Sequence, residues 1–311
     1  HLILPSPAFA WLATLVDFPQ DRILLQYEGT ATRWDQNHWR ALLDDPILMA
    51  PRMILNHWLW SLAGRLTTAS HLAIGSHAVA NLRSLGYTKV FQATNVTNFS
   101  PKDQQKSFTW PDGFDDPHQC RIGYIGHCFP VKGIDDLLPA FAQACGQNPN
   151  LRLLLALSGD GHPQRVHRWL HRLRLHHKVA LLGLIPVQQW LEQLDALVLP
   201  YRSAVTTTLF PSLMLEADRA SCPLITTAVP EWEEILLTTA PHLTIVPPRN
   251  VSALAQAMAA VRQRHSHHPV SFLNLPSQET RLVHMQTIYR HLAGLEDTVR
   301  TDNPCSPTER S

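Results

Sequence analysis

The sequence predicts an α/β protein with two Rossmann-like lobes, each a parallel sheet with helices on both faces, the first lobe being incomplete. Strand-like and helix-like segments alternate from residue 121 onward, and residues 1–98 repeat the pattern less regularly. Such βαβ alternation implies parallel sheets that bind ligands at the carboxyl ends of their strands. The chain has 311 residues, which at roughly 100–200 residues per domain suggests about two domains.

The second lobe begins with a strand and an amphipathic helix. Its strands are expected at residues 121–126, 151–157, 179–182, 196–199, 224–227 and 243–246. Apolar residues recur at helical spacing from Ile134 to Cys145. Pro139 is expected within or close to the first turn of that helix, where a missing N–H is tolerated. The next helix is predicted to turn inward Val166, Trp169, Leu170 and Leu173.

Two later helices have recognisable starts. Asn250 is expected to cap a helix whose apolar positions are Val251, Leu254, Met258 and Val261. Ser277 is expected to start a final helix that ends at Gly294 and carries on one face Leu282, Met285, Tyr289 and Leu292. The tail beyond Glu296 has no core-forming residues, so we expect it to be disordered.

The first lobe gives weaker signals. Residues 22–27, 72–75 and 89–92 are strand-like, and Ala78–Leu85 is predicted to be a short helix closed by Gly86. The chain starts with His1 rather than Met, and we expect the start to be a cut. The expected domains are a partial first lobe (1–98), a polar linker rich in Pro, Gly and Asp (99–119), the second lobe (120–276), a C-terminal helix (277–295) and the tail (296–311).

Composition excludes several classes of function. The 26 Lys and Arg against 25 Asp and Glu leave a net charge of +1, which argues against a nucleic-acid partner. No apolar run of about 18 residues exists, so no membrane span is expected. The five cysteines are scattered, without CxxC spacing, which argues against a disulfide framework and a zinc site and fits a reducing cytoplasm.

The segment GHCFPVKG (126–133) joins a strand to a helix. Gly126 at the strand end lets the backbone approach a ligand, and Lys132, six residues later, can reach a phosphate. The segment is neither a Walker sequence nor GxGxxG, which counts against nicotinamide cofactors and ordinary P-loop nucleotides. The alternative is an ordinary solvated lysine.

A second segment, residues 208–227, begins a helix near Pro211. Proline suits the first helical position, so the N–H groups of Ser212 and Leu213 are expected to face an anion site. Glu216 lies one to two turns further on, beside apolar neighbours. A carboxylate in such surroundings favours hydroxyl donors such as those of a ribose. The alternative is an acid that the helix dipole favours there.

With these segments in place, residues 121–293 resemble the C-terminal lobe of family 4 (group 1) retaining glycosyltransferases, which have two Rossmann-like lobes (the GT-B fold) and use sugar nucleotides. In that family the Arg and Lys of Gly-Arg-x4-Lys-Gly hold the donor diphosphate. Their counterparts are His127 and Lys132, followed by Gly133. The sequence SGDG (158–161) resembles the family's Gly-Asp-Gly, and residues 76–101 resemble the end of its first lobe.

The resemblance also implies a donor site. The family's Glu-x7-Glu pair falls on Thr208 and Glu216, so the ribose-binding acid is kept and the acid near the donor sugar is replaced. Glu234 falls at the usual acid of the following loop, and the backbone near Gly183 would meet the nucleobase. The implied donor-binding residues are Gly126, Gly133, Gly183, Thr208, Phe210, Pro211, Ser212 and Leu213.

Three departures separate this sequence from the family. His127 lacks the bidentate fork of an arginine, so diphosphate binding should be weaker and pH-sensitive. Thr208 removes a carboxylate that would face the transferred sugar. The first lobe is shorter than the family's, so we expect this chain to bind nucleotide yet transfer sugar poorly; Glu28 lies roughly where the family has a histidine.

The function implied by the resemblance is a cytoplasmic glycosyltransferase that retains anomeric configuration. The donor is a nucleoside-diphosphate sugar and the acceptor is a glycan or a lipid-linked glycan, with neither a cofactor nor a metal required. Lys132, His127 and Glu216 are the expected catalytic residues. Two alternatives remain open, a non-catalytic sugar-nucleotide-binding partner subunit and a sugar-nucleotide epimerase on the same fold.

Two features rich in histidine and arginine have simpler interpretations. His167 and His171 have the i, i+4 spacing of metal ligands, but no third ligand converges with them in sequence. Residues 165–178 are basic and are expected to be a solvent-facing helix, with peripheral contact to anionic lipids of the inner membrane face as the alternative.

The substitution of Arg by His127 predicts pH-dependent donor binding. Affinity should fall as pH rises through the range in which imidazole loses its proton. The His127→Arg variant should bind more tightly and with less dependence on pH, because guanidinium stays charged. Calorimetric titrations of a sugar nucleotide at several pH values measure this, and a profile that the substitution leaves unchanged would remove His127 from the site.

Overall fold

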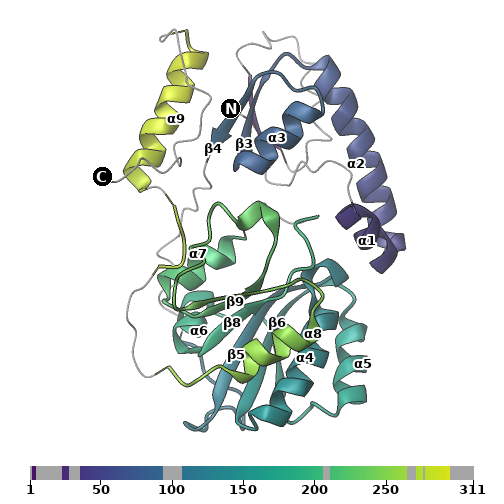
Figure 1. Ribbon diagram of the computed structural model, residues 1–311, viewed down its shortest axis with the longest axis vertical. Helices are drawn as coiled ribbons and strands as arrows, with labels where there is room; N and C mark the ends of the chain where they lie inside the picture. Colours follow the sequence, from purple (N-terminus) through teal and green to yellow (C-terminus); the bar gives the residue numbers. More distant parts are fainter. Residues whose placement is uncertain are drawn as a thin grey trace. The chain divides into compact units, whose positions relative to one another are not determined.

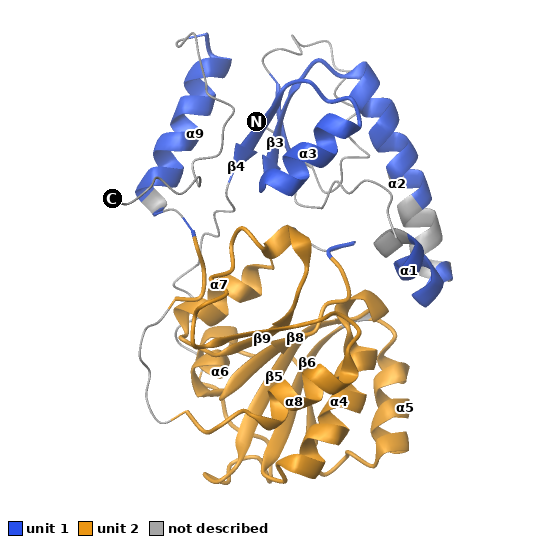
Figure 2. Cartoon of the chain, in the orientation of Figure 1, with its two compact units in different colours: residues 1–97, 204–210, 275–311 blue, residues 98–203, 211–274 orange. Residues whose placement is uncertain are grey.

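The structure, a computed structural model, describes residues 2–4, 23–27, 36–93, 107–205, 211–264, 271–275 and 277–294. The chain divides into two compact units (Figure 2), with residues 1–97, 204–210 and 275–311 in unit 1 and residues 98–203 and 211–274 in unit 2. Each unit contains one parallel sheet. The predicted α/β class is therefore confirmed. The expectations for Glu28, Thr208, Phe210 and residues 296–311 lie outside the described residues.

Unit 2 contains a six-stranded sheet in the order β10-β9-β8-β5-β6-β7. Four strands have the predicted bounds: β7 (Val179–Leu182), β8 (Ala196–Leu199), β9 (Leu224–Thr227) and β10 (Leu243–Val246). The two others are longer than predicted: β5 (Cys120–Cys128) and β6 (Leu151–Gly161). They run past their apolar stretches because they pair with each other as far as Cys128 and Gly161.

Helices cover both faces of this sheet. One face carries α4 (Ile134–Gln147), α5 (Pro163–Leu173) and α8 (Val251–Ala259), whose apolar residues share one buried cluster with the strands. The other face carries α6 (Val187–Gln193), and α7 (Ser212–Arg219) packs beside α6. At Gly123 of β5 a Cβ would lie 2.2 Å from the Leu194 side chain and 2.6 Å from Trp190. Helix α6 therefore packs directly on the backbone of β5.

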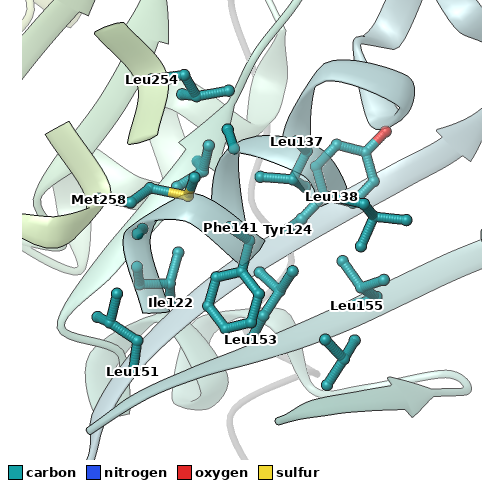
Figure 3. Packing of buried hydrophobic residues seen from close by; sticks show 14 of the residues in the cluster. Ile122, Tyr124, Leu137, Leu138, Phe141, Leu151, Leu153, Leu155, Leu254 and Met258 are labelled. Carbon is teal, nitrogen blue, oxygen red and sulfur yellow. The ribbon is translucent and has the colours of Figure 1, made fainter. Parts of the chain in front are cut away.

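The core of unit 2 lies between the sheet and the α4 face (Figure 3). Ile122, Leu153 and Leu155 of the strands and Leu137 and Phe141 of α4 have no exposed surface. Fully burying such a side chain contributes about 1.5–3 kcal/mol. This layer makes the sheet a rigid support for the loops at its edge.

Pro139 is deeper in its helix than predicted. Helix α4 starts at Ile134, directly after Gly133, so Pro139 lies in the second turn and not the first. Its missing N–H removes a bond from the helix interior, which normally destabilises it. The apolar face that includes Leu138 and Phe141 is fully buried, and that burial keeps the helix continuous.

Unit 1 contains a four-stranded sheet in the order β1-β2-β3-β4. Its strands are β1 (Leu2–Leu4), β2 (Leu24–Tyr27), β3 (Ser70–Ile74) and β4 (Val90–Ala93), and its helices are α1 (Gln36–Asp44), α2 (Pro46–Leu66), α3 (Ser76–Ser84) and α9 (Gln278–Leu292). The predictions for β2, β3, β4 and α3 hold within two residues at each end. Helices α1 and α2 were not predicted, because apolar side chains such as Leu43 and Trp58 lie on their exposed faces.

Helix α9 starts at its predicted cap, where Ser277 Oγ accepts a hydrogen bond of 3.1 Å from the Thr280 N–H. Only part of the predicted apolar face is buried. Ile288 is fully buried in the unit 1 core, with Met285 and Leu292 packed beside it. Leu282 and Tyr289, which share the predicted apolar face with these residues, are 53% and 41% exposed.

Residues 107–119 pack against unit 2, although the sequence predicts a linker there. Phe114 is buried, and its carbonyl accepts a 2.8 Å bond from Arg121 Nε at the start of β5. The Arg121 guanidinium also stacks 4.4 Å from the Trp110 ring centre. Residues 99–106 are outside the described residues. None of the described helices is both long enough and apolar enough to cross a membrane.

The burial of Ile288 predicts that α9 stabilises unit 1. The Ile288→Ala variant should lose about 2–5 kcal/mol of unfolding free energy, the usual cost of such a truncation in a core. Leu282→Ala on the exposed face is the matched control and should change it by less than about 0.5 kcal/mol. Urea denaturation of both variants tests this, and equal losses would contradict the buried face described here.

Candidate functional site

The strand order of unit 2 marks the place for a ligand. Strand β5 lies between β6 and β8: the chain passes from β5 to β6 on one side and crosses from β7 to β8 on the other. In open parallel sheets, ligands bind outside the carboxyl ends of the strands at this switch point. The segments there are Phe129–Gly133 after β5 and Pro200–Ser203 after β8. They supply the candidate site.

The two segments touch at Gly133. Its φ of +78° is left-handed, and a Cβ on it would lie 1.8 Å from the Pro200 carbonyl oxygen. Only glycine fits such a position. The turn before it is a short 3-10 helix, Pro130–Lys132, in which the Lys132 N–H bonds to the Phe129 carbonyl at 2.9 Å.

Lys132 is half-buried, and its Nζ lies 4.4 Å from the ring centre of Tyr201. An ammonium group over an aromatic face is a favourable cation–π contact. Burial disfavours the charged form and lowers the pKa of Lys132 to about 8. The lysine is therefore still charged at neutral pH, and an anion would find in it a cation with little competing water.

Contacts with Trp232 and Thr227 fix the position of Tyr201. It is buried, its ring meets Trp232 edge-on at 5.3 Å between centres, and its carbonyl accepts a hydrogen bond from Thr227 Oγ1. Burial also raises the pKa of Tyr201, so its hydroxyl stays protonated. The aromatic platform beneath Lys132 is thus part of the packed sheet edge.

An ion pair ties the two segments together. Arg202 donates from Nε and Nη2 to both carboxylate oxygens of Asp136, at 2.6 and 2.7 Å. The Arg202 N–H also bonds to the Val131 carbonyl at 2.9 Å. A bidentate guanidinium–carboxylate pair fixes geometry as well as energy. It holds the turn that carries Lys132 against the loop that carries Tyr201.

His127 lies near the end of β5. Its Nδ1 is 2.6 Å from the Ser158 hydroxyl on β6, and its carbonyl accepts a 3.0 Å bond from the Tyr124 hydroxyl. These contacts fix both the ring and the backbone. Next to it, Gly161 has a φ of +95°, and a Cβ there would lie 2.7 Å from the Cys128 carbonyl carbon. Gly161, the last residue of the SGDG segment and of β6, therefore packs directly on the backbone of β5, the strand that carries His127.

Helix α7 follows the β8 loop. It starts at Ser212, with Pro211 as its N-cap and no side chain capping its first N–H groups. Pro211 thus precedes the helix by one residue instead of opening it. Glu216 lies in the second turn and is half-buried between the buried residues Leu215 and Ala217.

The structure brings together only part of the predicted site. Lys132 and Gly133 share one turn, and Gly126 and His127 lie on the strand that leads to it. Gly183 follows the edge strand β7 and is exposed. Thr208 and Phe210 lie outside the described residues.

The sequence interpretation missed Tyr201, Ser158 and Arg202 as partners of the predicted residues. Tyr201 could have been found, because it follows a predicted strand at its carboxyl end. No sequence signal links Arg202 to Asp136, since the pair depends on the fold.

A comparison with protein families shows what unit 2 is similar to. Residues 119–264 match the family described as "Glycosyl transferases group 1". The match covers 146 of the 311 residues, so this segment is similar to a group 1 glycosyltransferase domain. It spans β5 to β10 and contains both the Lys132 turn and helix α7.

One curated relative and several solved structures resemble the chain. An exopolysaccharide phosphotransferase of Streptomyces coelicolor is 31% identical over 132 residues, which are 42% of this chain and 14% of that protein. HepE of Anabaena, solved with UDP and glucose, has a TM-score of 0.56 at 13% identity and covers 94% of this chain and 97% of its own. TarM, known from S. aureus, has a TM-score of 0.61 at 12% identity, covering 92% of this chain and 54% of TarM. At such identities the structures show the fold, which is that of GT-B glycosyltransferases.

If the Lys132 turn binds a diphosphate, Lys132 should set the upper pH limit for that binding. With a pKa of about 8, its ammonium loses its proton between pH 7 and pH 9, so binding then requires proton uptake. Affinity for UDP should fall above pH 8, by up to about tenfold per pH unit. Lys132→Arg stays charged and should show a flat profile. Calorimetry from pH 7 to 9 tests this; a parent profile as flat as the variant's would be evidence against the role.

Proposed function

We propose that the chain is part of a retaining glycosyltransferase that uses a nucleoside-diphosphate sugar as donor. The single observation that carries the proposal is the half-buried Lys132 in a glycine-closed turn at the switch point of the sheet. The presence of UDP in the HepE structure supports a donor of this class. The chain spans 14% of its curated relative, so donor, acceptor and reaction are all part of the proposal.

The chemistry asks the protein to stabilise a departing diphosphate. The bond between the anomeric carbon and the diphosphate oxygen breaks, and an acceptor hydroxyl forms the new bond on the same face of the sugar while its proton leaves. Lys132 neutralises charge that grows on the diphosphate, and a charge-assisted contact is shorter and stronger than a neutral one. The uncapped N–H groups of Ser212 and Leu213 add a second source of positive potential.

His127 has a smaller part in this scheme. It lies where the family has an arginine, and its Nδ1 is engaged with Ser158. The ring can therefore offer its Nε2–H to a phosphate as a single donor. Glu216, in the second turn of α7, is proposed to accept hydrogen bonds from the ribose hydroxyls.

The acceptor is proposed to be a glycan or a lipid-linked glycan. The curated relative is named an exopolysaccharide phosphotransferase, and WaaG, another structural neighbour with a TM-score of 0.53, is described as a glycosyltransferase involved in lipopolysaccharide biosynthesis. Both names support a role in polysaccharide assembly. A cytoplasmic location belongs to the same proposal.

One observation favours a second candidate, a non-catalytic subunit that binds sugar nucleotides. A histidine replaces the family's arginine and its Nδ1 lies 2.6 Å from the Ser158 hydroxyl, so the site lacks the bidentate guanidinium of the family. Transfer assays on the full-length protein separate the candidates. Turnover of a sugar nucleotide supports the enzyme, and binding without turnover supports the subunit.

Two substitutions distinguish the parts of the donor site. Lys132→Ala should lower the affinity for UDP or GDP about tenfold or more, the effect of losing a charge-assisted contact. It should barely change the affinity for the bare nucleoside. Glu216→Ala should weaken nucleotide and nucleoside alike, and Glu216→Gln should recover part of the loss. Calorimetry with each ligand pair measures these effects.

The matched control is Lys178→Ala. Lys178 lies just before β7, at the amino edge of the same sheet, and donates to the Pro149 carbonyl. This variant should bind every ligand like the parent. If the Lys132 and Glu216 variants fold and also bind like the parent, the donor site lies elsewhere and the proposed function fails.

A further inference from the structure

Helix α5 carries an open pocket that the donor site does not use. The pocket has a volume of about 460 Å³ and is lined by Arg165, Arg168, Trp169 and Arg172. All four residues come from α5, which packs beside α4 in unit 2 (Figure 1). Three guanidinium groups surround one aromatic ring. The sequence has no acidic residue between Asp160 and Glu192, so α5 itself supplies no negative charge to balance them.

Half of this pocket is rigid. Arg165 donates from Nε and Nη2 to the two carboxylate oxygens of Asp135, at 3.2 and 2.8 Å. Trp169 Nε1 donates to the same carboxylate at 2.9 Å. Asp135 is buried, and its negative charge is taken up by these three bonds. The carboxylate therefore holds Arg165 and Trp169 in place, and it presents no unpaired negative charge to the pocket.

The other half keeps its positive charge. Arg172 stacks over Trp169, with its guanidinium carbon 5.4 Å from the ring centre. Arg168 makes a long 3.4 Å contact with the Gln164 carbonyl. In the part of the chain that the structure describes, neither forms an ion pair with a carboxylate, and both are exposed.

The spacing of the arginines defines the shape of a ligand. Residues three and four apart share one face of a helix, so positions 165, 168 and 172 form a row of about 10 Å at 1.5 Å per residue. Arg165 is already paired with Asp135, so the charge open to a ligand is that of Arg168 and Arg172, about 6 Å apart along the helix axis. An extended chain with a negative charge on successive units can meet both and continue along the row.

We propose that this pocket binds an acidic polysaccharide, a chain whose sugar rings carry carboxylate or phosphate groups. Guanidinium groups bind both anions in a bidentate way, and the arginine-covered Trp169 gives the row a flat, fixed floor. That the polysaccharide is the acceptor or the growing product rests on the proposed function. The binding itself does not depend on that function.

A lipid surface fits the pocket less well. Helices that lie on membranes insert apolar side chains beside their basic ones. The exposed residues of α5 are Pro163, Gln164, His167, Arg168, His171 and Arg172, so it has no large apolar side chain to insert. The hollow between the arginines also suits a chain better than a flat surface. A nucleic acid is disfavoured by the net charge of +1.

Binding of oligogalacturonate to the protein tests the proposal. The parent should bind it and should not bind neutral dextran of equal length. Exchanging both exposed arginines, Arg168→Ala with Arg172→Ala, should weaken binding about tenfold or more. Lysines at both positions keep the charge and should restore part of the affinity. Inorganic polyphosphate and vesicles of phosphatidylglycerol are the comparison probes.

The control is Arg40→Ala with Arg65→Ala, which removes two exposed helical arginines from unit 1 and should leave oligogalacturonate binding unchanged. Equal binding by parent and α5 variant overturns the proposal, as does binding of only polyphosphate or only vesicles. UDP titrations of the same variants distinguish the two proposals. Loss of oligogalacturonate binding with normal UDP binding supports a pocket distinct from the donor site. Failure of the parent to bind UDP counts against the donor site alone.

Discussion

Two loops can share one edge of the unit 2 sheet because residue 133 has no Cβ. The Pro200 carbonyl occupies the space that a side chain at Gly133 would need, at 1.8 Å from the position of its first carbon. This contact brings the turn after β5 onto the loop after β8. The position of Lys132 over Tyr201 and the Arg202–Asp136 pair both depend on it. Any larger residue at 133 would push the two loops apart and so separate Lys132 from Tyr201 and Arg202 from Asp136.

The electrostatics of the site follow from that packing. Bringing the loops together takes the Lys132 ammonium partly out of water, which disfavours its charge. The aromatic face of Tyr201 returns part of the lost stabilisation, and a bound anion would return more. A cation kept in this state gains more from a diphosphate than a fully hydrated lysine would. The arginines of α5 are the opposite case. They are exposed and stay hydrated, so each single contact with an anion is weaker and binding depends on several of them in a row.

The sequence was most informative where burial alone determines structure. Strands β7 to β10 were predicted to the residue, because buried parallel strands are short apolar runs. Prediction failed where several forces compete. Helix α2 was missed because its apolar residues, among them Trp58, do not follow one face. In α9 several faces carry apolar residues, and only packing on unit 1 selects Ile288.

The candidate site divides in the same way. Lys132 and Gly133 follow from a local motif, so the sequence reveals them. The aromatic support of Tyr201 and the hydroxyl of Ser158 meet their partners across strands, and these contacts exist only in three dimensions. Local spacing therefore predicts which groups carry charge, and the fold decides what holds them.

The path of the chain between the units also has a consequence for how the protein is made. Unit 1 contains residues from both ends of the chain, and Ile288 near the C-terminal end fills its core. A ribosome releases the first sheet long before α9 emerges, whereas all strands of unit 2 are complete by Val246. Because domains fold as their segments emerge, unit 2 should be native first. Until α9 emerges, the nascent first sheet keeps uncovered the apolar face that Ile288 later fills.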